Sequence, residues 1–262
     1  MSWSRSDVDD DEQVLDRRRR EIMPLEISQL PTSTKKVRIL FFGKHNCHYS
    51  QRAFEHLHRL GFEVDAVWSR SRSEPMPDDI GTWRGDYILC FRSYFILRKS
   101  LLERASIAAI NFHPAPTEYP GSGCINWALY DNAEHYGVTA HIMNEEIDNG
   151  AIIECRRFPI LPRDNVSTLL AKAHQEASDL LIDISTGLKL EGEIYLKKKL
   201  EESKTERWHG QARKMKEIDD LQNVSLACTK EELEKIIRAT YTPDFPPVID
   251  LHGYKFVLKL DN

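Results

Sequence analysis

No stretch of this 262-residue sequence approaches the roughly 20 consecutive apolar residues that a membrane-spanning helix needs. The first residues also lack the apolar core of a signal peptide. The formal net charge is −5, and this lack of basic excess argues against a broad nucleic-acid-binding surface. We therefore expect a cytoplasmic protein whose partners are neither a membrane nor a nucleic acid.

The sequence has only five cysteines, which are widely spaced and include no C-x-x-C pair. This pattern is typical of free thiols in a reducing compartment and excludes a disulfide scaffold. Histidines at positions 45 and 48 flank Cys47, but no second group of ligands accompanies them, so no metal site is predicted. Gly43 follows a predicted strand without a G-x-G-x-x-G pattern, so a dinucleotide site is not expected.

What the sequence does contain is a regular alternation of strand and helix patterns from residue 37 onward. Predicted strands cover residues 37–42, 62–68, 86–91, 107–112, 137–143 and 151–158. Predicted helices cover residues 50–60, with Ser50 as the N-cap, and 95–104, 125–132 and 166–188. This order predicts an α/β fold with a mostly parallel, Rossmann-like sheet and right-handed crossovers.

Composition divides the chain into three predicted parts. Residues 1–34 form an N-terminal arm in which an acidic run is followed by four arginines that largely cancel it. Residues 35–190 form the catalytic domain. Residues 191–262 form a small C-terminal module with a capping box at 229–232, a helix, and a β-hairpin built from 248–251 and 254–258. A homodimer through this module is left open.

The most informative residues are Asn111 and His113, which close a buried apolar strand, and Asp148, which follows about 35 residues later in an Asp-Asn-Gly segment. Side chains alternate along a strand, so Asn111 and His113 lie on one side, at the strand end where ligands collect in open α/β sheets. An amide donates to a developing oxyanion, an imidazole relays a proton, and a carboxylate orients the imidazole. The three residues are therefore predicted to catalyse acyl transfer to a nucleophile that the substrate supplies.

Simpler interpretations stay open for single residues. His113 could cap a strand in the core, and Asp148 could serve only the turn. His141 is expected in the core or beside the site, and Trp127 in the core. Cys124 could be a reactive thiol at a helix start, although a small packed thiol is more common.

Three segments together resemble a known family. They are residues 111–126 (NFHPAPTEYPGSGCIN), 136–143 (YGVTAHIM) and 147–153 (IDNGAII). They resemble the sugar N-formyltransferases that use N10-formyltetrahydrofolate, and the GDP-perosamine N-formyltransferase type most of all. The resemblance is dense from about residue 86 to 160. It implies a folate co-substrate, a nucleotide-linked amino sugar as acceptor, a role in surface polysaccharide synthesis, and an Asn-His-Asp triad at Asn111, His113 and Asp148.

The resemblance also implies binding residues. Folate would contact the strand end after residue 90 and the segment before Asp148, at Phe91, Arg92, Tyr94, Ile142, Met143 and Glu146. The acceptor would contact the loop after His113, at Tyr119 and Gly121.

One departure separates this sequence from other branches of the family. Where the methionyl-tRNA and glycinamide-ribonucleotide branches carry a Ser-Leu-Leu-Pro-like stretch, this chain has Ala115-Pro116-Thr117-Glu118. The change points away from those acceptors. Formyl transfer to a tRNA, a nucleotide or an amino acid, and a non-catalytic module that binds folate or a nucleotide sugar, remain the alternatives.

Overall fold

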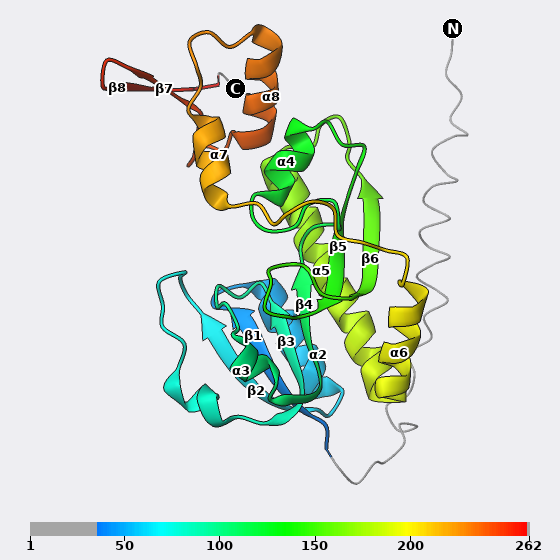
Figure 1. The fold of residues 1–262 in the computed structure, drawn as a ribbon. Helices are drawn as coiled ribbons and strands as arrows, with labels where there is room; N and C mark the ends of the chain where they lie inside the picture. Colours follow the sequence, from blue (N-terminus) through cyan, green and yellow to red (C-terminus); the bar gives the residue numbers. More distant parts are fainter. Residues whose placement is uncertain (1–35, 261–262) are drawn as a thin grey trace, which may run out of the picture. The chain divides into compact units, whose positions relative to one another are not determined.

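The computed structural model describes residues 36–260, which belong to one compact unit (Figure 1). The arm predicted over residues 1–34 lies outside the described residues. None of the helices between residues 36 and 260 combines the length and the apolar composition needed to cross a bilayer.

A six-stranded sheet in the order β2-β1-β3-β4-β5-β6 forms the centre of this unit. Neighbours within the first four strands are parallel, and β5 and β6 pair antiparallel at the other edge, which confirms the predicted mostly parallel α/β fold. The strands are β1 (Arg38–Lys44), β2 (Glu63–Ser69), β3 (Gly85–Phe91), β4 (Ala105–His113), β5 (His135–Ile142) and β6 (Ile152–Pro159).

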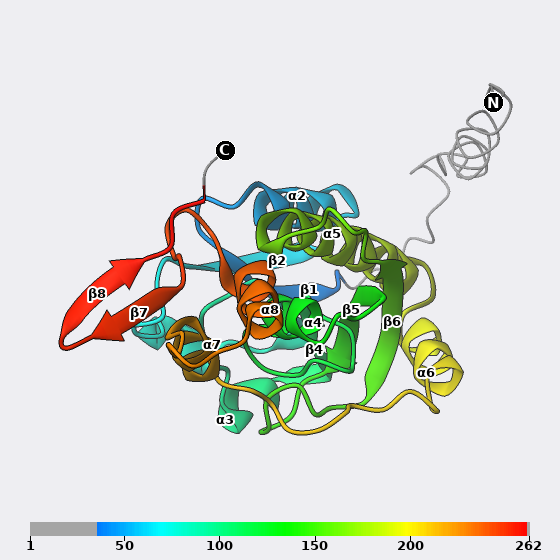
Figure 2. The ribbon, with the colours of Figure 1, turned by 90° about the horizontal axis from the view of Figure 1, so that it is seen from above.

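The central strands are buried on both faces, as their continuous apolar runs require. One face packs against α2 (His48–Arg59) and α5 (Val166–Glu191), which lie together in Figure 2. The other face packs against residues 95–105, including the short helix α3 (Lys99–Leu102). Helix α4 (Cys124–Tyr130) follows β4 at the carboxyl end of the sheet.

Two predicted helix boundaries are wrong. Helix α2 begins at His48 with Cys47 at the N-cap position, and Ser50 lies inside the helix, where its hydroxyl accepts from the Lys44 amide. The helix predicted over 95–104 shrinks to the single turn α3. The residues before it form a loop in which Phe95 packs edge-on against Phe42 in the core.

Three helices and a hairpin make up the C-terminal part of the described chain. They are α6 (Glu193–Glu202), α7 (Met215–Gln222), α8 (Lys230–Thr240), β7 (Val248–Leu251) and β8 (Tyr254–Val257); a 3-10 turn, η2 (Asp78–Thr82), lies earlier, after β2. The hairpin and α8, which Thr229 caps, agree with the sequence. Helices α6 and α7 were not predicted, because both are short and each fully buries only one side chain. The Asn126 side chain on α4 donates to the Ala239 carbonyl of α8 (2.7 Å).

The start of α5 offers a test of the fold. The Asn165 side chain accepts from the Thr168 amide while the Thr168 hydroxyl accepts from the Asn165 amide, both at 3.0 Å. We expect Asn165→Ala to lower the free energy of unfolding by about 1 kcal/mol, because amide groups of the first turn lose their partner. Urea unfolding would measure the change. Ser167→Ala, an exposed substitution in the same turn, is the control and should change stability by less than about 0.5 kcal/mol.

Candidate active site

A cleft of about 630 Å³ opens at the carboxyl end of the parallel strands. Most of the predicted site residues line it: Asn111, His113, Asp148, Arg92, Tyr94, Met143, Glu146 and Gly121. The strand ends of β1, β3 and β4 contribute to this cleft, as the open α/β arrangement predicts. The loop between β5 and β6 brings Asp148 to the same place.

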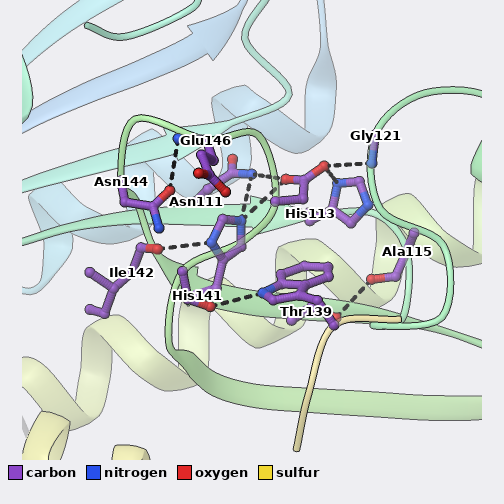
Figure 3. Close-up of polar contacts among 12 residues, drawn as sticks. Asn111, His113, Ala115, Gly121, Thr139, His141, Ile142, Asn144 and Glu146 are labelled. Atoms are coloured by element: carbon purple, nitrogen blue, oxygen red, sulfur yellow. Dashed lines mark hydrogen bonds and ion pairs between the residues drawn. The ribbon is translucent and has the colours of Figure 1, made fainter. Parts of the chain in front are cut away.

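The structure brings the side chains of Asn111 and His113 to the buried carboxylate of Asp148 (Figure 3). His113 Nδ1 lies 3.4 Å from Asp148 Oδ2, and Asn111 Nδ2 donates to Asp148 Oδ1 at 3.4 Å. The Gly121 backbone amide donates to Asp148 Oδ2 at 2.8 Å. The amide, the imidazole and the carboxylate therefore meet in one site, as the alternation of β4 and the later Asp-Asn-Gly segment indicated.

The backbone around Asp148 is specialised for this position. Asp148 has a φ of 46°, in the left-handed region that non-glycine residues rarely occupy. A Cβ atom on Gly150 would lie 1.7 Å from the Ile142 carbonyl oxygen, so only glycine allows the loop to return so close to β5. The Asp-Asn-Gly segment thus serves the turn and the site at once.

His141 is a member of the site and not merely part of the core. Its Nδ1 lies 2.9 Å from the Ile142 carbonyl oxygen, which only accepts hydrogen bonds, so Nδ1 carries a proton. Its Nε2 lies 3.1 Å from Asn111 Nδ2 and 3.3 Å from Asp148 Oδ1. In the neutral form, His141 accepts from the Asn111 amide and fixes its orientation.

Both nitrogens of His113 face oxygen acceptors. Nδ1 faces Asp148, and Nε2 lies 3.1 Å from the Tyr119 carbonyl oxygen. Burial alone would lower the pKa of His113, but the Asp148 carboxylate, together with Cys124 and the Tyr119 carbonyl, raises this pKa above its ordinary value. At neutral pH the resting His113 is therefore an imidazolium ion.

Asp148 is held in the ionised form. Its burial would raise the pKa of the carboxyl, yet the charge on His113 and the hydrogen bond from the Gly121 amide lower this pKa below its ordinary value. The carboxylate is 8% exposed, and its charge is balanced within the site.

The Cys124 thiol lies beside His113 and is directed at a backbone carbonyl. Sγ lies 3.3 Å from the Gly121 carbonyl oxygen, to which it donates, and 3.7 Å from His113 Nε2. That nitrogen is already directed at the Tyr119 carbonyl and carries a proton. The imidazole is thus not free to take the proton from the thiol, and the geometry gives no support to a cysteine nucleophile.

Trp208 closes one side of the site and was missed in the sequence. Its indole Nε1 donates to the Gly150 carbonyl at 2.8 Å, and its ring lies edge-on to His141 and His113, with centroids 5.0 Å and 5.9 Å away. It belongs to the segment between α6 and α7, which is bonded to the loop after His113: the His209 amide donates to the Thr117 carbonyl at 2.9 Å. No local motif marks this contact, because it joins residues distant in the sequence.

Three predicted binding residues do not line the cleft. Phe91 is fully buried in the core. The Ile142 side chain packs into the same core, and only its carbonyl approaches the site, through His141. Tyr119 packs against Tyr136, and only its carbonyl reaches His113. In each case the backbone lies near the site while the side chain turns the other way.

Trp127, expected in the core, is half-buried on α4. The Arg213 guanidinium covers its ring, 4.0 Å from the ring centroid, and the side chain does not line the cleft.

The sheet, with an amide, two imidazoles and a carboxylate at its strand ends, places the chain among α/β proteins that carry a polar site at the carboxyl edge. Comparison with known families narrows this class. The family model described as formyl transferase matches residues 37–184, more than half of the chain, so the chain belongs to the formyl transferase family.

A methionyl-tRNA formyltransferase from Thermosynechococcus vestitus is 32% identical over 121 residues, which cover 45% of this chain and 37% of that protein. The chain thus matches little more than a third of that relative's length.

Solved structures share the fold. A sugar N-formyltransferase from Shewanella sp. FDAARGOS_354 superposes with a TM-score of 0.65 at 18% identity, covering 86% of this chain and 97% of that one. An N-formyltransferase from Helicobacter canadensis was solved with folinic acid and dTDP-3-aminofucose. It superposes with a TM-score of 0.60 at 14% identity, covering 83% of this chain and 85% of that one.

The electrostatics of the site can be tested without any substrate. In the native protein, we expect NMR titration to place the midpoint of His113 above 6.5, the ordinary value for histidine. Asp148→Asn removes the charge that raises this pKa while burial remains, so the midpoint should fall. Glu146→Gln, which neutralises an exposed carboxylate of the same loop, is the control and should leave the titration of His113 in place. An unchanged midpoint in Asp148→Asn would contradict the pairing.

Proposed function

We propose that this protein transfers a formyl group from N10-formyltetrahydrofolate to the primary amine of a nucleotide-linked amino sugar. The observation that carries the proposal is the convergence of Asn111, His113 and Asp148 in the cleft of a formyl transferase fold. Formyl transfer to an amine needs an oxyanion donor and a route for one proton, and these residues supply both. It needs no nucleophile from the protein.

Each residue has a distinct role in the proposed reaction. The acceptor nitrogen forms a bond to the formyl carbon, the bond from that carbon to N10 breaks, and the proton lost by the amine is returned to N10. The Asn111 amide donates to the formyl oxygen as it becomes negative, in exchange for its long 3.4 Å bond to Asp148. His113, in its deprotonated form, takes the proton that the amine loses and passes it to N10. Asp148 orients His113.

The cleft suits a folate donor. Its volume lies in the range of pockets for ligands of this size. Arg92, Tyr94, Met143 and Glu146 line it and are proposed to contact folate, while Gly121 lies where the acceptor would approach. The Helicobacter canadensis enzyme, solved with folinic acid and a dTDP-linked amino sugar, supports this pair of substrates by its shared fold.

For the acceptor, we favour an amino sugar of the GDP-perosamine type, used in surface polysaccharide synthesis. The support is the motif spanning residues 111–126 and the departure from the Ser-Leu-Leu-Pro-like stretch of the tRNA branch. Methionyl-tRNA is the second candidate, because the T. vestitus relative is an enzyme of that name. Against tRNA stands the formal charge of −5, since tRNA enzymes need basic surfaces.

A panel of acceptors tests the proposal. The protein would be incubated with N10-formyltetrahydrofolate and, separately, with GDP-, dTDP- and UDP-linked amino sugars, methionyl-tRNA and free amino acids. We expect the mass of one formyl group to be added to an amino sugar, with release of tetrahydrofolate. Formylation of methionyl-tRNA alone would overturn the sugar assignment, and folate binding without tetrahydrofolate release from any acceptor would indicate a binding module.

Asn111→Ala and His113→Ala are each expected to lower kcat by at least about 10²-fold, because the first removes the donor to the developing charge and the second removes the group that relays the proton. Steady-state kinetics and circular dichroism would show loss of activity in a folded protein. Asn149→Ala, which removes an exposed amide next to Asp148, is the control and should keep kcat within about twofold. Wild-type turnover in either active-site variant would refute the assigned role.

The pH profile provides a further prediction. The reaction needs a neutral amine and a deprotonated His113, so kcat/KM should rise with pH, and the raised pKa of His113 should carry this rise above pH 6.5. In Asp148→Asn, the pKa of His113 falls, so the profile should level at lower pH although its maximum is smaller. The pKa of the acceptor amine is the same in both proteins and serves as the internal reference. Profiles of identical shape would contradict the role of His113.

A further inference from the structure

One end of the cleft carries positive charge without a matching negative charge. Lys44, Arg72 and Arg92, here called the cationic cluster, all line the cleft. Among residues 36–260, no carboxylate forms an ion pair with any of the three. Their neighbour Arg70, by contrast, pairs with Glu74 and does not line the cleft.

Two members of the cationic cluster lie over one aromatic ring, and the third lies over the ring of Tyr49. Lys44 Nζ lies 5.1 Å from the centroid of the Tyr94 ring, and Arg72 Cζ lies 5.8 Å from the same centroid. Arg92 follows β3 with a φ of 59°, a left-handed conformation that is costly for arginine, and its Nη1 donates to Cys47 Sγ at 2.9 Å. The three side chains therefore come from the ends of three strands and line one cleft, with Lys44 and Arg92 half-buried and Arg72 exposed.

Ser69 ties these strand ends together. Its hydroxyl is fully buried, donates to the Gly43 carbonyl at 3.1 Å and accepts from the Tyr94 amide at 2.9 Å. Its carbonyl accepts from the His45 amide at 2.9 Å. The loops after β1, β2 and β3 are thereby fixed relative to one another, so the cationic cluster is assembled before any ligand arrives.

His174, which lines the same part of the cleft from α5, reports the positive field there. Burial and the charges on Arg92, Lys44 and His48 lower the pKa of His174 to about 3. It stays neutral at physiological pH and adds a dipole without adding to the repulsion. The protein thus holds like charges together that repel one another in the free state.

We propose that the cationic cluster binds the anionic end of a substrate. This inference rests on the proposed function, which supplies two such ends: the glutamyl carboxylates of the folate donor and the diphosphate of the acceptor. Both offer several negative oxygens, which lysine and arginine bind by charge-assisted hydrogen bonds. Binding either end relieves the repulsion among Lys44, Arg72 and Arg92. The reacting groups at Asn111 and His113 lie elsewhere along the same cleft, so the contact anchors a substrate without touching the chemistry.

Binding measurements on Lys44→Gln and Arg72→Gln test the proposal. Calorimetric titration would use two matched pairs of probes: folinic acid against its analogue in which a primary amide replaces the glutamate, and GDP against guanosine. We expect each variant to bind one anionic probe about tenfold more weakly while the uncharged partner of that pair binds as before. Arg70→Gln, which removes an exposed and paired cation nearby, is the control and should change neither affinity. Lys44→Arg keeps the charge and should retain most of the affinity.

The two pairs of probes identify which substrate provides the anionic group. A loss confined to folinic acid assigns the cationic cluster to the donor's glutamyl end, and a loss confined to GDP assigns it to the acceptor's diphosphate. Affinities for both anionic probes within twofold of the wild type in both variants would overturn the proposal. Because the titration contains no amine acceptor, it stands apart from the turnover assay. If the protein transfers no formyl group but the variants still bind an anionic probe more weakly, the proposed function is refuted while the assignment of the cationic cluster stands.

Discussion

The buried carboxylate of Asp148 is the constraint on which the site depends. An ionised carboxylate at 8% exposure is stable only when its charge and its lone pairs are satisfied locally. Three groups do this: His113, Asn111 and the Gly121 amide. Since these come from β4 and the loop after β4, and Asp148 lies between β5 and β6, satisfying one charge also fixes the relative positions of the segments that carry the proposed reactive groups.

The same charge sets the chemical state of its neighbours. The imidazolium of His113 and the ionised Asp148 stabilise each other, which raises the pKa of His113 and lowers the pKa of Asp148. His141 differs, because the Ile142 carbonyl fixes its proton on Nδ1 and leaves Nε2 to receive the Asn111 amide. The two histidines beside this carboxylate therefore have separate roles. His113 carries a positive charge, and His141 orients the Asn111 amide.

The reactive residues could be predicted from the sequence because local rules place them. Strand alternation puts Asn111 and His113 on one side, and turn chemistry puts Asp148 and Gly150 in a tight loop. The α/β order, the mostly parallel sheet and the C-terminal hairpin follow from periodicity in the same way. These features depend on neighbours in the chain, which the sequence displays directly.

What could not be predicted depends on contacts between distant segments. Trp208 reaches the site only because the segment after α6 bonds to the loop after His113, and the short helices α6 and α7 on either side each bury only one side chain. Side-chain direction was the other failure. Phe91 and Tyr119 lie in the expected segments, but their side chains turn into the core, and the backbone alone faces the site.

The cleft thus has two ends built by different means. At the reacting end, charges are balanced inside the protein, since Asp148 is matched by His113 and the surrounding donors, and the end is complete without a ligand. At the cationic end, Lys44, Arg72 and Arg92 are held near the scaffold of Ser69 and Tyr94, and no carboxylate in the described part of the chain, residues 36–260, pairs with them. A protein tolerates such an imbalance where a ligand completes it, because the repulsion in the free state becomes a gain in affinity when an anion binds. Because the charges at the reacting end are balanced, its side chains are in place before a substrate binds. The unbalanced positive charges at the cationic end favour ligands that carry an anionic group.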